Sequence, residues 1–293
     1  VTINLPQIGI LAEGNEEKFF HILEKRLELC KKVCMLRYEL LQRANSDSSP
    51  IHWQHGAIAR LGKHESIQEL LINGYATVTL GYIGVYEATL LTKGVSHTDP
   101  KGTEFALKVM KKLNEKVNEW KAETGLGFAL YGTPAESLTH RFNSIDRKRF
   151  GVIKDVTDKG YYINSFHVDV RENIDVFSKF EFEAQFQDLS RGGCISYAEI
   201  PNMSHNLEAL ETMVSYIYEH IQYAEFNTKS DYCQVCGYDG EIVLDENNNW
   251  TCPQCHNQDT SKMNVTRRTC GYLGENFWNE GRTKEIKERV LHI

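Results

Sequence analysis

Two cysteine pairs, Cys233-Gln-Val-Cys236 and Cys252-Pro-Gln-Cys255, are separated by fifteen residues near the carboxyl end of the sequence. Each pair fits one tight turn, and two such turns at this separation can present four thiolates to one tetrahedral metal ion. The spacing therefore predicts a zinc ribbon over residues 228–262. Four protein ligands leave no open coordination position, so we expect a structural rather than a catalytic ion.

The residues between the two pairs have the pattern of a short hairpin. Segments 238–240 and 245–249 are rich in turn formers, whereas 241–244 and 250–251 have strand character. The region is too short and too polar to build a hydrophobic core of its own, so a bound ion would supply its stability. Two disulfides or an iron ion are the alternatives to zinc, and His256 is a minor candidate ligand.

The composition is that of an ordinary globular chain, with 41% hydrophobic and 25% charged residues among 293. No apolar run is long enough to cross a membrane, and residues 1–10 lack the pattern of a signal peptide, so we expect a cytoplasmic protein without membrane contact. The net charge of −7 argues against a broad nucleic-acid-binding surface. The sequence opens without methionine in a strand-like stretch, so we expect a part of a longer protein.

Residues 1–227 alternate helical and strand patterns, which predicts an α/β fold, either wound or closed into a barrel. Asp99 and Pro100 open one helix as a capping residue and a first helical residue. We expect helices at 16–44, 65–72, 100–124 and 205–225, and strands at 75–84, 127–131, 161–166, 179–186 and 194–200.

A candidate anion site follows the expected strand at 127–131. Thr133 suits a helix N-cap, Pro134 the first helical position and Glu136 the reciprocal position of a capping box. A helix that begins here exposes unpaired N–H groups and the positive end of its dipole, and the hydroxyl groups of Thr133 and Ser137 add donors. A helix that is merely well capped is the alternative.

The last motif is the stretch Arg267-Arg268-Thr269-Cys270-Gly271-Tyr272-Leu273-Gly274. By itself it indicates a strand that ends in a tight turn, where glycine tolerates positive φ. Together with the cysteine pairs just upstream, however, this string closely resembles the glycyl-radical motif of the anaerobic ribonucleotide reductases. Four other stretches extend the resemblance, namely 1–6, 131–137, 160–165 and Gly192-Gly193.

The resemblance implies a fold and an activity. The chain resembles the carboxy-terminal half of the large catalytic subunit, so residues 1–227 would form part of a ten-stranded α/β barrel of the glycyl-radical and ribonucleotide reductase type. Residues 263–293 would carry the radical loop and the carboxy-terminal tail. The implied reaction converts ribonucleoside triphosphates to 2′-deoxyribonucleotides, with formate as the external reductant.

Roles for individual residues follow from the same resemblance. Gly271 would store the radical after an activating enzyme, with an iron–sulfur cluster and S-adenosylmethionine, removes one of its hydrogens. The loop that resembles the substrate-phosphate loop supplies Thr133, Ala135, Glu136 and Ser137, chiefly through backbone N–H groups. Asn4 and Tyr131 are expected beside the substrate, although ordinary strand packing would also explain both.

Other parts of the enzyme are expected upstream of Val1. In the family, a thiyl cysteine on a finger loop starts the chemistry, and none of the cysteines here matches it, so this chain alone should be inactive. The site for nucleotide effectors is also expected upstream. We expect a homodimer that meets its activating enzyme.

Two rival functions remain open on the sequence. A formate acetyltransferase-like lyase shares the glycine loop but lacks the ribbon. A zinc-ribbon module that binds nucleic acid would need a basic face, and residues 228–293 carry eight basic and ten acidic side chains.

Overall fold

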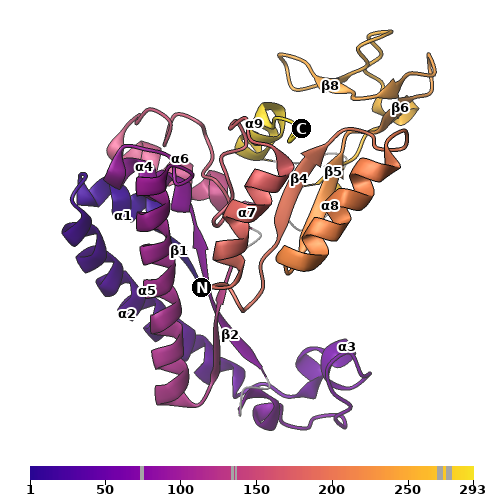
Figure 1. Ribbon diagram of the computed structural model, residues 1–293. Helices are drawn as coiled ribbons and strands as arrows, with labels where there is room; N and C mark the ends of the chain where they lie inside the picture. The colour runs from indigo at the N-terminus through magenta and orange to yellow at the C-terminus, as the bar shows by residue number, and fades with distance from the viewer. Residues whose placement is uncertain (73–75, 133–134, 136, 269–272, 275–278) are drawn as a thin grey trace.

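The computed structural model describes residues 1–72, 76–132, 135, 137–268, 273–274 and 279–293. Figure 1 shows an α/β body that carries a small, strand-rich extension formed by residues after about 228. In the described part of the chain, no helix is both long enough and apolar enough to cross a membrane.

The first sheet contains β1 (Thr2–Asn4), β2 (Thr77–Ile83) and β3 (Gly127–Tyr131), in that spatial order. Both pairings are parallel, with Asn4 opposite Ile83 and Gly81 opposite Tyr131. The carboxyl ends of the three strands therefore meet at one edge of the sheet. In open parallel sheets, ligands bind outside that edge.

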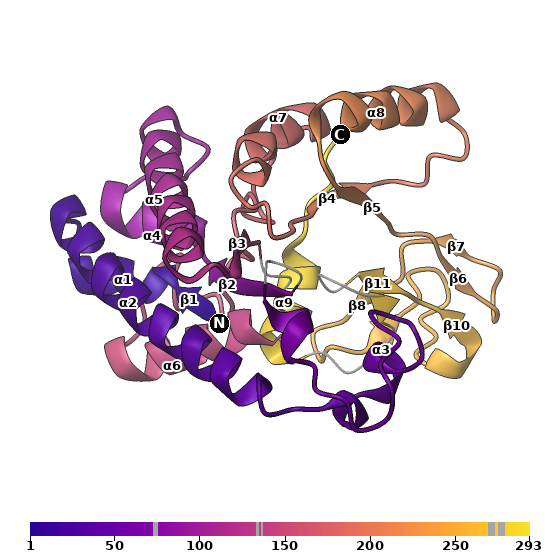
Figure 2. The ribbon, with the colours of Figure 1, turned by 90° about the horizontal axis from the view of Figure 1, so that it is seen from below.

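Helices cover the outer face of this sheet (Figure 2). They are α1 (Leu5–Ala12), α2 (Glu16–Leu41), α4 (Val85–Lys93) and α5 (Pro100–Thr124). As predicted, α5 begins at Pro100, and the Asp99 side chain caps it by accepting from the N–H of Lys101. One buried stripe of α5, which includes Met110, Leu113 and Trp120, packs in the same core as β2 and β3. Apolar burial thus fixes these helices on the sheet.

A second parallel pair consists of β4 (Ser196–Ile200) and β5 (Ala224–Thr228). Helices α7 (Val176–Gln187) and α8 (Leu207–His220) lie outside it, and α6 (Leu138–Phe150) precedes it in the chain. The stretch before β4 also meets the end of β3, where the N–H of Gly192 donates to the Leu130 carbonyl at 2.7 Å. A Cβ at position 192 would lie 2.7 Å from that oxygen, so the contact requires glycine.

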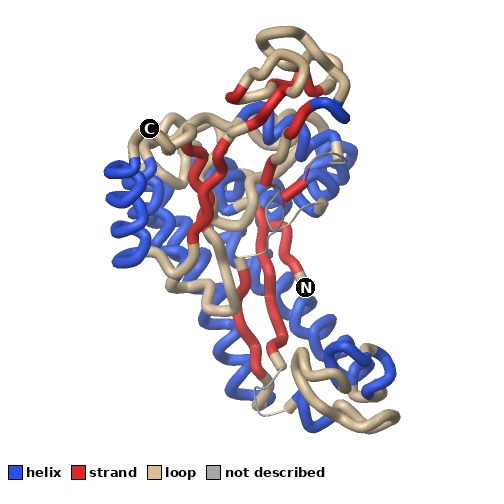
Figure 3. The backbone as a smooth tube through the Cα atoms, turned by 90° about the vertical axis from the view of Figure 1, so that its right-hand side faces the viewer, coloured by secondary structure: helices blue, strands red, loops and turns tan. Residues whose placement is uncertain are grey.

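The α/β class is confirmed, but a ten-stranded barrel is not shown. The described strands form no closed sheet, since the first sheet has three strands and β4 pairs with β5 alone. Figure 3 shows the strands of both groups along the middle of the body, with helices outside them.

Two expected strands are wrong. Residues 161–166 are irregular, because tertiary partners take their backbone groups: the N–H of Ile163 donates to the Glu87 carboxylate at 2.8 Å, and its carbonyl accepts from Gly84. Residues 179–186 lie inside helix α7, which Asp175 caps by accepting two backbone N–H bonds. The alternating phenylalanines there imitate a strand pattern, but Phe180 and Phe186 are fully buried against different neighbours.

Two expected helices have different bounds. The helix expected at 205–225 ends at His220, and the chain then forms β5, because the short stretch from Ala224 pairs with β4. The stretch 65–72 contains only a 3₁₀ turn, η2 (Gln68–Leu71). Two further short elements precede it, η1 (Ser46–Ser48) and α3 (Pro50–Trp53).

The carboxy-terminal extension contains short strands and one helix. Strand β6 (Asp231–Cys233) pairs with β7 (Asp239–Gly240) and β10 (Met263–Asn264), and β8 (Val243–Leu244) pairs with β9 (Trp250–Thr251). After η3 (Thr260–Lys262), the remaining elements are β11 (Arg267–Arg268), β12 (Leu273–Gly274) and α9 (Glu280–Glu288). The hairpin of β8 and β9 is the one that the sequence predicts.

Candidate functional site

The four ribbon cysteines converge on one point. Sγ of Cys233 lies 3.7 Å from Sγ of Cys255, and Sγ of Cys236 lies 3.6 Å from Sγ of Cys252. All four sulfur atoms lie within 4.8 Å of one another. A tetrahedral ion with bonds of about 2.3 Å to sulfur separates its ligands by roughly 3.8 Å, so the donor set fits zinc. The distances exclude disulfides, whose sulfur atoms are about 2 Å apart.

The two turns that hold these cysteines have the same backbone geometry. The carbonyl of Cys233 accepts from the N–H of Gly237 at 2.9 Å, and the carbonyl of Cys252 accepts from His256 at 2.9 Å. Gly237 and His256 both have positive φ, at 75° and 58°. His256 is exposed and lies outside the four-sulfur group, so it acts in the turn and not as a ligand.

Burial and backbone N–H groups shift the pKa values of Cys233 and Cys236 in opposite directions. Burial opposes ionisation of Cys233, but hydrogen bonds from the backbone N–H groups of Cys236 and Val235 lower its pKa from 9.0 to about 7. Burial, together with the neighbouring thiols, raises the pKa of Cys236 to about 12. Like charges resist a second ionisation, and a bound cation would remove that resistance.

An arginine joins the ribbon to the strand that leads into the glycine motif. Arg267 of β11 donates to both oxygens of Asp231, at 2.6 Å each, and to the carbonyl of Ile242 at 2.9 Å. Its guanidinium also lies 5.0 Å from the ring of Trp250. Asp231 is 1% exposed and begins β6, which ends at Cys233. The turn that contains Cys233 and Cys236 is therefore connected to β11 by a buried, bidentate ion pair.

We expect Arg267→Met to destabilise the ribbon by about 3–5 kcal/mol, because it leaves the Asp231 carboxylate buried without its cation. Hydrogen exchange of the ribbon amides, including Ile242, measures the local opening free energy. Lys262→Met is the matched control, since Lys262 is 59% exposed and pairs only loosely with Asp259. If Arg267→Met lowered the opening free energy of the ribbon no more than Lys262→Met does, the role of this ion pair would be contradicted.

The expected phosphate loop is only partly described. Thr133, Pro134 and Glu136 lie outside the described residues, while Ala135 is buried and not helical. Helix α6 begins at Leu138, so the helix expected in this loop starts later than predicted. The reason is tertiary, because the N–H of Ala135 donates to Oδ1 of Asn164 at 3.2 Å and its carbonyl accepts from Arg282 at 2.9 Å.

Ser137 is the N-cap residue of α6 and makes no capping hydrogen bond with its side chain. It is exposed, whereas Ala135 is 3% exposed. The N–H of Ala135 is already bonded to Asn164, so it would have to leave that oxygen to meet a phosphate. The roles of Ala135 and Ser137 in phosphate binding stay predictions.

Asn4 and Tyr131 lie at the carboxyl ends of β1 and β3, on either side of β2. Asn4 caps α1, since its Oδ1 accepts from the N–H of Gln7 at 3.1 Å, and its Nδ2 donates to Asp146 at 2.8 Å. Burial raises the pKa of Tyr131. The strands thus bring both residues to the edge where Ala135 follows, and their contact with a substrate stays a prediction.

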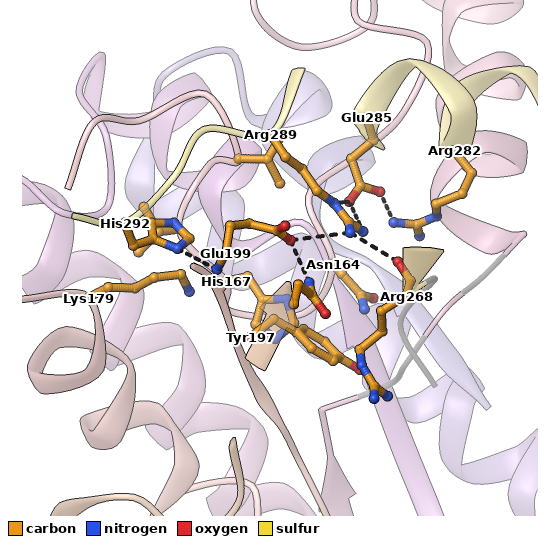
Figure 4. Close-up of a pocket in the computed structure, with 13 residues that line it drawn as sticks. Asn164, His167, Lys179, Tyr197, Glu199, Arg268, Arg282, Glu285, Arg289 and His292 are labelled. Atoms are coloured by element: carbon orange, nitrogen blue, oxygen red, sulfur yellow. Dashed lines mark hydrogen bonds and ion pairs between the residues drawn. The ribbon is translucent and has the colours of Figure 1, made fainter. Parts of the chain in front are cut away.

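Helix α9 and its C-cap residue, Arg289, contribute side chains that the sequence did not predict. Arg282, Glu285 and Arg289 line a small cavity of about 40 Å³ with Arg268 of β11 and Glu199 of β4 (Figure 4). The available signal was the Asn279 side chain as an N-cap, followed by acidic and basic residues at helical spacing. Two buried histidines also line the cavity, and burial lowers the pKa of His167 to about 4 and of His292 to about 3.

Comparison with known proteins decides the family. A family model described as anaerobic ribonucleoside-triphosphate reductase matches residues 1–292. The chain belongs to this family. It is 40% identical, over all of its length, to the anaerobic ribonucleoside-triphosphate reductase of Escherichia coli (strain K12), and 41% identical to that of Enterobacteria phage T4. These alignments cover 42% and 48% of the two relatives, so the chain spans less than half of their length.

Solved structures agree on the fold of the family. A structure described as anaerobic ribonucleotide reductase aligns over 99% of this chain and 44% of its own, with a TM-score of 0.74 and 24% identity. The anaerobic ribonucleotide reductase of Thermotoga maritima with MES in the active site aligns over 93% and 42%, with a TM-score of 0.68 and 23% identity. The family match therefore supports the reductase, and it supports neither of the two rival functions, the lyase and the nucleic-acid-binding module. Gly271, the expected radical residue, lies outside the described residues.

Proposed function

We propose that the protein of which this chain forms all or part reduces ribonucleoside triphosphates to 2′-deoxyribonucleotides without oxygen, by a glycyl and thiyl radical mechanism. The observation that carries this proposal is the junction at Arg267. A closed four-sulfur site and the strand that enters the Arg267–Gly274 motif are joined there by a buried ion pair. Such a junction suits a metal that holds a radical loop in place, and the family match supports the same reading.

The proposal divides the chain into three parts. Residues 1–227 belong to a ten-stranded catalytic barrel that other parts of the protein complete. Residues 228–262 form the zinc ribbon, although β10 at Met263–Asn264 extends its sheet slightly further. Residues 263–293 carry the radical loop and a tail that includes α9. The structural zinc ion would be held by the four cysteines and would supply folding stability only.

Individual residues have proposed roles at the carboxyl edge of the first sheet. Gly271 stores the radical, and Thr133, Ala135, Glu136 and Ser137 bind the substrate phosphates, chiefly through N–H groups. Asn4 and Tyr131 lie beside the ribose and the formate that serves as reductant. The position of both residues at the strand ends supports this assignment, since ligands of parallel sheets bind there.

The proposed partners follow from the chemistry. A separate activating enzyme with an iron–sulfur cluster and S-adenosylmethionine would generate the radical. Nucleotide effectors would bind elsewhere in the full protein, which we propose to be a cytoplasmic homodimer.

The decisive experiment is anaerobic turnover by the full-length protein. After treatment with its activating enzyme, it should convert ribonucleoside triphosphates to deoxyribonucleotides in the presence of formate, with carbon dioxide as the oxidised product. Omission of formate should stop turnover and leave substrate binding intact. Failure of the activated protein to form any deoxyribonucleotide from all four common ribonucleoside triphosphates would overturn the proposal.

A further inference from the structure

Three charged side chains of α9 and its C-cap link two distant segments of the chain. Arg282 and Glu285 are three residues apart on one face of α9, and Arg289, the C-cap residue, follows Glu285 by four residues. Figure 4 shows them directed toward the cavity beneath α9. The Arg282 and Glu285 side chains are 2% and 8% exposed, and the Arg289 side chain is 8% exposed. Interactions between charges in such a setting are strong and poorly screened.

One end of this triplet holds the segment that contains Ala135. Nη2 of Arg282 donates to the Ala135 carbonyl at 2.9 Å and to Oγ1 of Thr139 at 3.2 Å. The approach of α9 is fixed by Gly281, where a Cβ would lie 2.3 Å from the Gly160 carbonyl oxygen. The guanidinium therefore reaches this carbonyl from a helix that has little freedom to withdraw.

The other end of the triplet holds the strand that enters the glycine motif. Nη1 of Arg289 donates to the Arg268 carbonyl at 3.0 Å and pairs with Glu199 of β4 at 3.2 Å. Glu199 is held in turn by the carboxy-terminal segment, since its N–H donates to Nδ1 of His292 at 2.9 Å. Arg289 thus holds the backbone of Arg268, the last residue of β11.

Glu285 is the joint between the two arginines. One carboxylate oxygen pairs with Arg282, and the other accepts from Nη2 of Arg289 at 3.0 Å. A displacement of either guanidinium leaves this buried carboxylate poorly compensated, so the energy of one contact depends on the other. The three side chains form a continuous polar connection from the Ala135 carbonyl to the Arg268 carbonyl.

We propose that Arg282, Glu285 and Arg289 are positioning residues that couple nucleotide binding near Ala135 to the position of β11 at Arg268. The inference rests on the proposed function for the identity of the nucleotide. A phosphate that takes the Ala135 N–H from Asn164 shifts the Ala135 carbonyl, and Arg282 transmits the shift through Glu285 to Arg289. Coupling between two sites is reciprocal, so a change at Arg289 must also alter nucleotide binding.

The effect of each substitution is measured at the segment that the altered residue does not contact. In the full-length protein, Arg289→Gln should weaken binding of ribonucleoside triphosphates at least fivefold by calorimetry, although its described partners are Glu285, Glu199 and the Arg268 carbonyl. Arg282→Gln should speed hydrogen exchange of the Arg268 amide at least fivefold. The double variant should be no worse than the more damaging single variant, because both effects pass through Glu285.

Lys284→Gln on the same helix is the matched control, since Lys284 is 45% exposed, and it should change neither measurement. If a glutamine variant does not fold, Arg282→Lys or Arg289→Lys replaces it, because lysine keeps the positive charge but cannot form the paired hydrogen bonds of a guanidinium. The coupling would be overturned if Arg289→Gln changed only hydrogen exchange at Arg268 and Arg282→Gln changed only nucleotide binding. Absence of nucleotide binding by the unaltered protein would overturn the proposed function, and hydrogen exchange in Arg282→Gln would then decide the connection by itself.

Discussion

Gly271→Ala should abolish the radical and all turnover in the activated full-length protein. A Cα radical is stabilised by delocalisation between its amide nitrogen and carbonyl group, which requires a planar centre. A side chain crowds that planar geometry, so only glycine accommodates it without a clash. Electron spin resonance of the unaltered, activated protein should show a doublet, split by the single remaining α hydrogen, and this signal should be missing from the variant.

A second glycine provides the control for this experiment. A Cβ at Gly14 would meet no atom within 4 Å, so Gly14→Ala should cost only the strain of its positive φ, on the order of 1 kcal/mol. The doublet and the turnover should survive that change. A doublet that persists in Gly271→Ala would refute the assignment of the radical to this residue.

Cys252→Ser should reduce the metal content from one zinc ion per chain to nearly none. Cys252 is fully buried among the other three sulfur atoms, and structural zinc contributes on the order of 10 kcal/mol to the folding of such small sites. The apolar cluster of the ribbon is small, with Ile242, Trp250 and Met263 at its centre, and cannot replace that energy. Metal analysis gives the stoichiometry, and hydrogen exchange over 231–268 reports the loss of structure.

His256→Asn is the matched control for the metal site. Asparagine tolerates the left-handed backbone that His256 adopts, and His256 lies outside the sulfur group, so one zinc ion per chain should remain. Treatment of the unaltered protein with a chelator should disorder the ribbon under conditions that leave residues 1–227 folded. A Cys252→Ser protein that keeps its zinc and its exchange protection would show that the ion does not hold the ribbon together.

Sequence patterns predicted the fold well where local signals act alone. Helix α5 follows its capping residue Asp99 and its apolar stripe, and β3 has the predicted bounds. The pattern misled at 161–166 and 179–186, where alternating apolar residues suggested strands. In the first stretch the Glu87 carboxylate takes a backbone N–H, and in the second the Asp175 cap starts a helix. A period of two in a short window does not tell a strand from a buried helix or an irregular core segment.

The candidate site divides in a similar way. The spacing of the four cysteines is enough to predict their convergence, because each pair needs only one local turn. The start of α6 was predicted too early, since Arg282 and Asn164, both distant in the sequence, hold the backbone of Ala135. Local capping signals do not decide where a helix begins when tertiary partners take the hydrogen bonds of the same backbone groups.

The sequence by itself determined the convergence of the four cysteines, the α/β class and the resemblance that the family match bears out, because each depends on spacing, on a motif or on local periodicity. Only the tertiary structure decided how the ribbon is joined to the glycine motif. Arg267 meets Asp231 across 36 residues, and Arg282 meets Ala135 across 147. Contacts between residues so far apart depend on how whole elements pack, and no local pattern of residues specifies them.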